Sequence, residues 1–474
     1  MPELEPVIGL EIHVQLKTAT KMFCSCPTAP GAEPNTQICE ICTGQPGALP
    51  RLNARAVDLA VRAGLALGAR VNGTSIFARK NYFYPDLPNG FQNSQLDPPI
   101  CRGGGLELPD YGRFIRLNRL HLEDDAGKCL HDEQRGQTLV DLNRAGTPLI
   151  EIVTEPDFRS SGEVLDFLKK LHAILVRLEV TAGRLEEGEF RCDVNVSLRP
   201  PGAGALGLRS EIKNLNSFRH AGQAVEYEIV RQGGLYERGE KVEQETRLFD
   251  PVRQETRSLR GKEEAHDYRY FPQPDLPPVV VPPELLARIK AEMPPLPEAV
   301  RAGLLALGLT AEQASVLLDR RGAVEYFETA RTFLDDPKRL ASLMVELLLP
   351  AAQREDREPL DCACAPGILA SLARLLAEGT LSRRAAYDLF PEIFAQGGDP
   401  EALARARGLI QISEAGALET LARGLIAAHP EEARRYREGQ EKLLSFFVGR
   451  LMRQSQGAAN PKLAGEILAR LLKA

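Results

Sequence analysis

Residues 7–16 read VIGLEIHVQL, a stretch in which every second residue is apolar. Because successive side chains of a β-strand point to opposite faces, this alternation predicts a strand with one buried face. The other face would carry Glu11 and His13 side by side. The stretch therefore predicts a sheet with an apolar face on a core and a polar face that holds ionisable groups.

Three further segments repeat this design, at residues 120–128, 190–198 and 210–218. Their polar rows contain the ionisable side chains His121, Glu123, Asp125, Asp193, Glu211 and Lys213. A solvated sheet face would explain any one of these strands, but such faces normally mix Lys, Thr, Ser and Glu. Four rows rich in Asp, Glu and His instead favour a bound divalent cation such as Mg²⁺, held together with a nucleotide.

The sequence lacks the phosphate-binding loops of the common nucleotide-binding folds. No GxxxxGK[ST] string occurs, which excludes a Walker-type loop. Gly202, Gly204 and Gly207 satisfy GxGxxG, but they follow two prolines and no helix is expected behind them. A nucleotide site would therefore be built on the sheet itself.

Four of the nine cysteines follow the pattern C-x-C-x12-C-x2-C. They are Cys24, Cys26, Cys39 and Cys42, and the loop between the two pairs is rich in Pro and Gly. Such a loop can fold back and bring four thiolates to one point, the usual arrangement of structural Zn²⁺. Four free buried cysteines are the alternative, and an iron–sulfur cluster is a more distant one.

The composition is that of a globular protein with more than one domain. Of its 474 residues, 43% are apolar and 26% charged, and no apolar run is long enough to span a membrane. Without a recognisable secretion signal, and with irregularly spaced cysteines, the chain is expected in the cytoplasm. The net charge of −6 argues against a general nucleic-acid coat, but not against one RNA-binding surface.

The order of elements predicts a sheet first and helices afterwards. Up to about residue 272, short alternating stretches predict an antiparallel sheet, with helices near residues 50–69 and 161–178. Residues 271–300 contain nine prolines and mark a domain boundary. Beyond them the pattern is helical, with the expected helix starts and stops at Thr310, Ser382, Gly397, Gly408 and Gly439.

Basic residues gather near the end of the chain. From Glu431 onward there are nine Lys or Arg against five Glu. A solvated helical surface would have the same composition, so charge alone does not predict a partner.

Long strings at seven places resemble one protein family. They are VIGLEIHVQL, ARKNYFYPDLPNGFQ, HLEDDAGK, DLNRAGTPLIEIVTEP, RCDVNVSLRP, EIKNLNSF and KEEAHDYRYFPQPDLPP. Together with the closing segment FFVGRLMRQSQGAANPKL, they look like the signature segments of the GatB/GatE family, the B subunits of aspartyl/glutamyl-tRNA amidotransferases. The resemblance covers the sheet-containing part and the helical part.

The resemblance implies an α+β fold with three domains. An antiparallel-sheet cradle with packed helices would span residues 1–293, an all-α domain residues 294–407, and a small helical tail similar to the YqeY domain residues 408–474. It also implies an activity, in which ATP and Mg²⁺ activate the side-chain carboxylate of misacylated Glu-tRNA(Gln) or Asp-tRNA(Asn). Glutamine-derived ammonia would then complete the amide. The resemblance further implies two partners, an amidase (glutaminase) A subunit, which would release the ammonia, and a small C subunit. The chain itself has no obvious glutaminase motif.

The resemblance and the polar rows together imply a set of site residues. The Mg²⁺ ligand candidates are Glu11, His13 and Glu123, with Asp193 and Glu211 as further catalytic carboxylates. The phosphate-neutralising candidates are Arg79, Lys80, Lys128 and Lys213. The expected contacts to the tRNA backbone are Arg434, Arg435, Arg437, Lys442, Arg450 and Arg453. A non-catalytic scaffold that binds tRNA and carries a structural cation is the alternative.

Overall fold

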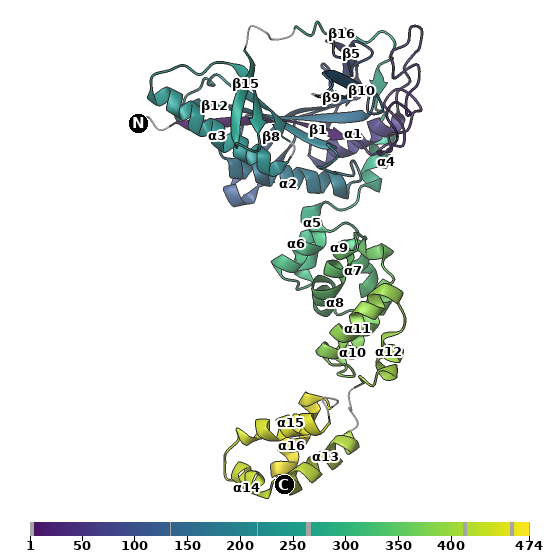
Figure 1. Ribbon diagram of the computed structural model, residues 1–474, viewed down its shortest axis with the longest axis vertical. Helices are drawn as coiled ribbons and strands as arrows, with labels where there is room; N and C mark the ends of the chain where they lie inside the picture. Colours follow the sequence, from purple (N-terminus) through teal and green to yellow (C-terminus); the bar gives the residue numbers. More distant parts are fainter. Residues whose placement is uncertain are drawn as a thin grey trace. The chain divides into compact units, whose positions relative to one another are not determined.

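The computed structural model describes residues 4–132, 134–215, 217–261, 267–410, 415–455 and 459–473. It divides into two compact units, Met1–Leu296 and Pro297–Ala474 (Figure 1). The first unit contains the sheet and the second is helical, so the predicted α+β fold is confirmed. Residues 262–266 of the KEEAHDYRYF string and residues 456–458 of the closing segment lie outside the described residues.

A 13-stranded sheet forms the centre of the first unit. Ten strands follow one another in the order β15 (Glu255–Gly261), β14 (Glu245–Asp250), β13 (Ser210–Leu215), β12 (Phe190–Arg199), β1 (Glu5–Gln15), β11 (Pro148–Thr154), β8 (Arg113–Asp124), β5 (Phe91–Ser94), β4 (Ala78–Asn81) and β16 (Phe271–Pro272). The other three are β2 (Arg70–Val71), β6 (Cys101–Arg102) and β7 (Gly105–Leu108). Two small sheets pair β9 (Lys128–Asp132) with β10 (Gln137–Asp141) and β3 (Thr74–Ser75) with β17 (Val279–Val280).

The sheet is antiparallel, as predicted, except at one pair. Strands β13 and β14 run parallel, because helix α3 (Phe218–Glu237) connects them and returns the chain to the same end of the sheet. The sequence pattern did not predict this crossover.

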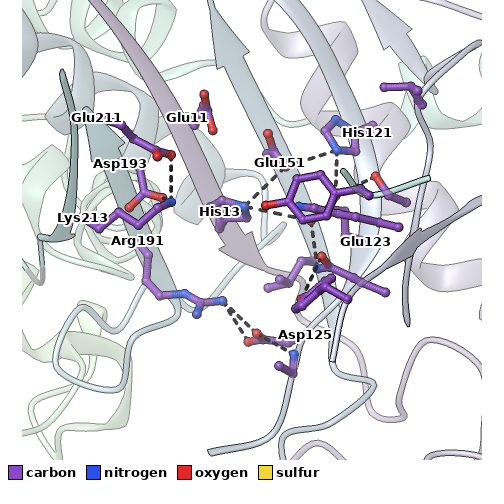
Figure 2. Close-up of a pocket in the computed structure, with 18 of the residues that line it drawn as sticks. Glu11, His13, His121, Glu123, Asp125, Glu151, Arg191, Asp193, Glu211 and Lys213 are labelled. Carbon is purple, nitrogen blue, oxygen red and sulfur yellow. Dashed lines mark hydrogen bonds and ion pairs between the residues drawn. The ribbon is translucent and has the colours of Figure 1, made fainter. Parts of the chain in front are cut away.

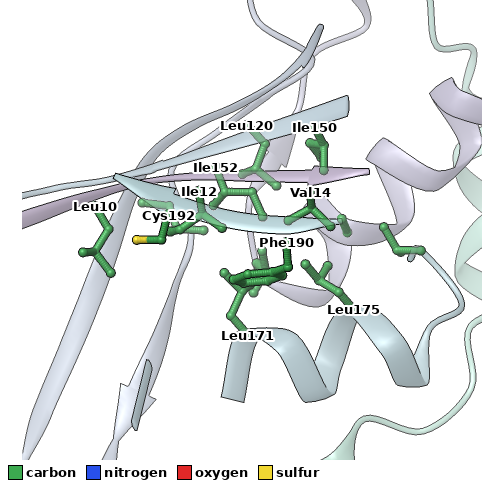
Figure 3. Close-up of a cluster of buried hydrophobic side chains, with 14 of the residues drawn as sticks. Leu10, Ile12, Val14, Leu120, Ile150, Ile152, Leu171, Leu175, Phe190 and Cys192 are labelled. Atoms are coloured by element: carbon green, nitrogen blue, oxygen red, sulfur yellow. The ribbon is translucent and has the colours of Figure 1, made fainter. Parts of the chain in front are cut away.

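One face of the sheet packs on helices. The helices that contribute buried side chains to this core are α1 (Ala54–Ala66), α2 (Ser161–Arg177), α3 and α4 (Pro283–Glu292). Figure 3 shows Ile12, Ile150 and Phe190 of the central strands next to Leu171 and Leu175 of α2. Burial of each such side chain contributes roughly 1.5–3 kcal/mol. Because this face is buried, the opposite face of the same strands is left to carry the polar rows.

Side-chain caps set where these helices begin. At the N-caps of α1, α2 and α3, the side chains of Asn53, Ser160 and Ser217 each accept a hydrogen bond from a backbone N–H in the first turn. Helix α1 is shorter than the predicted span of residues 50–69, because Asn53 caps it only after the extended segment that follows Pro50.

The second unit consists of helices. They are α5 (Pro297–Ala306), α6 (Ala311–Asp319), α7 (Ala323–Arg331), α8 (Pro337–Leu343), α9 (Leu349–Arg354), α10 (Pro366–Ala377), α11 (Arg383–Gln396), α12 (Pro400–Ala406), α13 (Ala415–Ala428), α14 (Pro430–Arg437), α15 (Leu443–Gln454) and α16 (Pro461–Lys473). Buried residues between 304 and 404 form one core, and those between 418 and 472 form another. The predicted domain boundaries at 293/294 and 407/408 stay predictions.

The predicted helix ends of this unit are confirmed. At the start of α6 the Thr310 side chain accepts a hydrogen bond from the Gln313 backbone N–H, and the Gln313 side chain accepts one from the Thr310 backbone N–H. Ser382 caps α11. Gly397, Gly408 and Gly439 follow α11, α12 and α14 with φ of 72°, 65° and 105°, a left-handed conformation that favours glycine. In the part of the chain that the structure describes, no helix is both long and apolar enough to cross a bilayer.

A buried carboxylate joins α3 to the edge of the sheet. Glu228 is fully buried, and both of its oxygens accept hydrogen bonds from Arg231. Arg247 of β14 lies 3.0 Å from Glu228 Oε1, and Thr256 of β15 donates to the same oxygen. These contacts hold β14 and β15 against the helix that supports β12 and β13.

We expect Glu228→Ala to destabilise the sheet-containing unit by about 3–5 kcal/mol, because Arg231 and Arg247 would lose their fully buried counter-ion and keep only Glu245. Urea unfolding of the full chain, followed by hydrogen exchange in β12–β15, measures this loss. The exposed Glu226, two residues away on α3, provides the matched control Glu226→Ala, for which we expect less than about 0.5 kcal/mol. Equal effects of the two substitutions would contradict the role of Glu228.

The same carboxylate predicts a dependence of stability on pH. Burial opposes its charge, but hydrogen bonds from Arg231 and Thr256 outweigh burial and hold the pKa of Glu228 below its usual value. The stabilisation is therefore complete above about pH 4.3, the pKa in the unfolded chain, and is lost as the pH falls through the lower folded pKa.

Candidate active site

A cavity of about 600 Å³ lies over the polar face of the sheet. The strand register brings its central residues into one row. Arg191 of β12 pairs with His13 of β1, His13 pairs with Glu151 of β11, and Glu151 pairs with His121 of β8. Residues directly opposite on neighbouring strands have Cβ atoms about 4.5–5.5 Å apart, so their side chains interact (Figure 2).

Two histidines and two glutamates form the centre of this row. His121 Nε2 lies 3.1 Å from Glu123 Oε1 and 3.2 Å from Glu151 Oε2. His13 Nε2 lies 3.4 Å from Glu151 Oε2 and 4.0 Å from Glu123 Oε2. Burial lowers the pKa of His121, but Glu151 and Glu123 outweigh burial and raise this pKa to about 9. The two carboxylates therefore create a point that attracts positive charge.

Glu123 is held rigidly in this cluster. Its side chain is buried, and Ser94 Oγ donates a hydrogen bond of 2.6 Å to Oε1. Gln92 Nε2 donates one of 3.0 Å to Oε2. Both donors belong to β5, which pairs with β8 through Ser94 and Glu123. The carboxylate orientation is therefore fixed before any ligand binds.

The ligand atoms of His13, Glu123 and Glu151 lie within 4.8 Å of one another. Two carboxylates and one imidazole suit a divalent cation such as Mg²⁺ or Mn²⁺. The predicted ligands were Glu11, His13 and Glu123, and the structure places Glu151 where Glu11 was expected. The reason is the register, which pairs His13 with Glu151 but pairs Glu11 with Val153 on the same strand.

Glu11 lies farther along the same face, beside a second ionic group. Lys213 Nζ lies 2.6 Å from Asp193 Oδ2 and 2.9 Å from Glu211 Oε1, and Glu11 accepts a hydrogen bond of 3.2 Å from Asn195. Burial, followed by the surrounding carboxylates, raises the pKa of Glu11. The structure thus brings Glu11, Asp193, Glu211 and Lys213 to one cavity, and their individual roles stay predictions.

Lys80 enters the cavity from strand β4. Its Nζ lies 5.0 Å from the ring centre of Tyr268 and 6.0 Å from that of Tyr82. Burial lowers the pKa of Lys80, but Glu123, Tyr270 and Glu151 together outweigh burial, and the pKa is raised above its usual value. Lys80 is therefore a cation held near the carboxylate cluster by charge and by aromatic rings.

Two of the predicted phosphate-binding residues lie outside the cavity. Arg79 precedes Lys80 on a strand, so its side chain points to the opposite face, where it forms a 2.7 Å ion pair with Asp275 and stacks on Phe91. Lys128 is exposed on the β9–β10 pair. Strand alternation and a local hairpin therefore place both outside this cavity, and their role in phosphate binding stays a prediction.

Sequence reasoning missed several cavity residues. Glu151 and Arg191 were not assigned a role, and His121 and Asp125 were noted only as members of a polar row. For Glu151 a local indication existed, because it stands between two buried isoleucines. Arg191 stands in the polar row of residues 190–198, but its position in the cavity depends on Asp125, whose two carboxylate oxygens each lie 3.0 Å from Arg191 Nη2.

The four clustered cysteines meet, as their spacing predicts. Their sulfur atoms lie within 4.8 Å of one another, and Cys39 Sγ is 3.9 Å from Cys42 Sγ. Tetrahedral Zn²⁺ with Zn–S bonds of about 2.3 Å requires sulfur separations of about 3.8 Å. The geometry and the donor type therefore fit zinc, whereas the other five cysteines form no such group among the described residues.

Family comparisons match both parts of the chain. The GatB/GatE catalytic domain matches residues 6–287, and the GatB domain matches residues 325–472. The chain belongs to the GatB/GatE family. The aspartyl/glutamyl-tRNA(Asn/Gln) amidotransferase B subunit of Nitratidesulfovibrio vulgaris strain DP4 is 50% identical over 472 residues, which cover 99% of each chain. Proteins of the same name from Solidesulfovibrio magneticus and Anaeromyxobacter sp. are each 49% identical, over 100% and 99% of each chain.

The basic residues predicted to contact tRNA lie on the last helices of this GatB/GatE family member. Arg434, Arg435 and Arg437 belong to α14, and Arg450 and Arg453 belong to α15. All of them, and Lys442 at the N-cap of α15, are exposed. Their contact with tRNA stays a prediction.

There are two candidate ligand sets: His13 and Glu123 with Glu151, as the structure arranges them, or with Glu11, as the sequence predicts. They predict different effects of substitution on Mn²⁺ affinity. We expect Glu151→Gln to weaken Mn²⁺ binding by roughly 10–100-fold, because it removes a charged ligand from the His13 cluster. Glu11→Gln, the matched control on the same face, should change this affinity by less than about threefold. Titration of the protein with Mn²⁺, followed by electron paramagnetic resonance of the free ion, measures both. A larger effect of Glu11→Gln would instead support the ligand set predicted from sequence.

Proposed function

We propose that this chain is the ATP-using, tRNA-binding subunit of an aspartyl/glutamyl-tRNA amidotransferase. It would phosphorylate the side-chain carboxylate of Glu on tRNA(Gln) or of Asp on tRNA(Asn), and the activated group would then be amidated. The observation that carries this proposal is the cavity, in which a His–carboxylate cluster and the cations Lys80, Lys213 and Arg191 converge on one sheet face. The shared name of relatives about 50% identical over the full length supports the substrate.

The chemistry explains why ATP is required. A carboxylate does not react with ammonia, because its oxygen is a poor leaving group. Attack of a carboxylate oxygen on the γ-phosphorus of ATP forms an acyl phosphate and releases ADP. Ammonia then adds to the acyl carbon, the carbon–oxygen bond to the phosphate breaks, and inorganic phosphate leaves as the amide forms.

The cavity residues suit these steps through charge and position. His13, Glu123 and Glu151 would hold Mg²⁺, which when bound supplies charge neutralisation for the phosphates. Lys80 lies near the same carboxylates and would pair with phosphate oxygens. Arg191 Nη2 donates hydrogen bonds of 3.0 Å to both carboxylate oxygens of Asp125. Asp125 therefore orients Arg191, a second cation, before substrate binds.

The proposal requires partners. Ammonia would come from glutamine hydrolysis in an amidase A subunit, within a complex that also contains a small C subunit. Water must be kept from the acyl phosphate, so ammonia has to arrive through a closed path within that complex. Exposed arginines of α14 and α15 would hold the tRNA backbone. In this proposal the complex works in the cytoplasm, with structural Zn²⁺ at the four cysteines.

An isotope experiment tests the phosphorylation step. Glu-tRNA(Gln) with ¹⁸O in its side-chain carboxylate is incubated with the assembled complex, ATP, Mg²⁺ and glutamine. We expect each amide formed to release one phosphate that contains one ¹⁸O atom, because one carboxylate oxygen leaves with the phosphoryl group. The same mixture without tRNA controls for unrelated ATP hydrolysis. Amide formation with unlabelled phosphate would contradict the mechanism. Amidation that persists when the proposed ATP site of this chain is inactivated would favour the scaffold alternative.

A further inference from the structure

A lysine is buried beside the four cysteines. Lys21 has none of its surface exposed, and its Nζ lies 3.5 Å from Cys42 Sγ and 3.3 Å from the carbonyl oxygen of Leu142. Within the described ranges, no carboxylate forms an ion pair with it. A buried ammonium group is strongly unfavourable unless an anion accompanies it. The thiolate of Cys42 is the anion that the structure offers.

The charge of a zinc site explains this pairing. Four thiolates around one Zn²⁺ carry two negative charges in excess, and a site buried in protein needs compensation for them. A lysine in contact with one sulfur removes part of that excess. Lys21 thus has the charge and the position of a counter-ion for a zinc-filled Cys₄ site. Burial of the ammonium group or of the anionic zinc site would each cost free energy without the other.

The cysteine loop also forms hydrogen bonds with residues 140–143. Asn35, between the two cysteine pairs, donates from Nδ2 to the Val140 carbonyl at 2.9 Å and accepts at Oδ1 from the Leu142 amide at 2.8 Å. The amide of Gln37 donates to Asn143 Oδ1 at 2.8 Å. These three hydrogen bonds join residues 140–143 to the cysteine loop.

That segment leads directly into the candidate active site. Arg144 lines the cavity, donates to the carbonyl of Ala126 at 3.0 Å, and lies 3.6 Å from Asp125. Gly146 has φ of 85°, and a Cβ atom there would lie 3.6 Å from Lys21 Cδ. The lysine stem thus packs against the same loop that carries Arg144 to the cavity.

We propose that Lys21 is the buried counter-charge of the zinc site and couples zinc binding to the position of residues 140–147. It acts as a positioning residue for Arg144, not as a catalytic one. The inference rests on the proposal that the four cysteines hold zinc, and the experiment separates the two.

The test measures zinc retention by the full-length protein, not activity. Zinc content is determined first, and release to excess chelator is then followed by absorbance. We expect Lys21→Met to speed zinc release or weaken zinc affinity by roughly 10–100-fold, the usual effect of removing a group that supports metal ligands. Lys21→Arg, which keeps the charge, should restore most of this affinity. Lys17→Met, at an exposed lysine four residues away, is the matched control and should leave release unchanged.

Hydrogen exchange tests the coupling in the wild-type protein. Removal of zinc should increase exchange of the amides in residues 140–147 by at least tenfold, while the core strand β12 stays protected. This measurement needs no variant, so it decides the coupling even if Lys21→Met does not fold.

The possible outcomes separate zinc binding, the counter-charge and the coupling. A wild-type protein that binds no zinc overturns the zinc proposal, and this inference with it. Zinc-containing wild type with unchanged release from Lys21→Met overturns the counter-charge role alone. Unchanged exchange in residues 140–147 after zinc removal overturns the coupling.

Discussion

Replacement of Glu123 by Gln is expected to lower tRNA amidation and tRNA-dependent ATP cleavage by roughly 10²–10³-fold. Glutamine keeps the shape of the side chain but removes its charge from the cluster with His13, His121 and Glu151. Both the proposed cation and the proton on His121 depend on that charge, since Glu123 Oε1 lies 3.1 Å from His121 Nε2. Amide formation on Glu-tRNA and phosphate release by the assembled complex measure the loss.

A surface glutamate separates this effect from general damage. Glu107 is exposed on β7, and we expect Glu107→Gln to retain full activity. Binding of tRNA by the Glu123 variant should be unchanged, because the proposed tRNA contacts lie on α14 and α15. If the Glu123→Gln complex amidates at the wild-type rate, the carboxylate cluster is a scaffold element and the proposed catalytic role is wrong.

A pair of lysines gives the second large expected effect. Lys80→Met should reduce ATP-dependent amidation by roughly 10²–10³-fold, because it removes a half-buried cation near the proposed phosphate position. Lys128→Met should change the rate by less than about twofold, because Lys128 is exposed on the β9–β10 pair. Steady-state rates of the two variants in the assembled complex, at saturating and limiting ATP, measure the difference.

Both lysines were candidates from sequence, with Lys80 the stronger one, and the structure places Lys80 in the cavity and Lys128 outside it. Lys80→Arg is the control for the charge and should retain more activity than Lys80→Met. A strong loss from Lys128→Met together with wild-type activity of Lys80→Met would mean that the phosphates bind elsewhere.

Local periodicity explains which parts of the site could be predicted. The alternation of residues 7–16 is a property of one strand, so it correctly placed Glu11 and His13 on the polar face. The C-x-C-x12-C-x2-C spacing is likewise local, and the four sulfurs do meet. The capping residues Thr310 and Ser382 act within one helical turn, and the structure confirms both as helix starts.

Alternation of side chains also separates two candidates that the sequence analysis had grouped. Arg79 and Lys80 are neighbours on a strand, so they cannot both face the same cavity. In the string ARKNYFYPDLPNGFQ they stand side by side as a basic pair. Only four residues of it form strand β4, too few for a pattern to stand out.

Sequence patterns were enough to predict the strand faces, the cysteine cluster, the helix caps and the family resemblance. The tertiary structure was needed to show that Glu151, not Glu11, lies opposite His13, that Asp125 holds Arg191, and that Lys21 is buried against Cys42. The physical reason is distance along the chain. Side-chain direction repeats every two residues within a strand, whereas register is set by pairing between separate segments of the chain, such as β1 and β11, and a shift of one residue would change every neighbour.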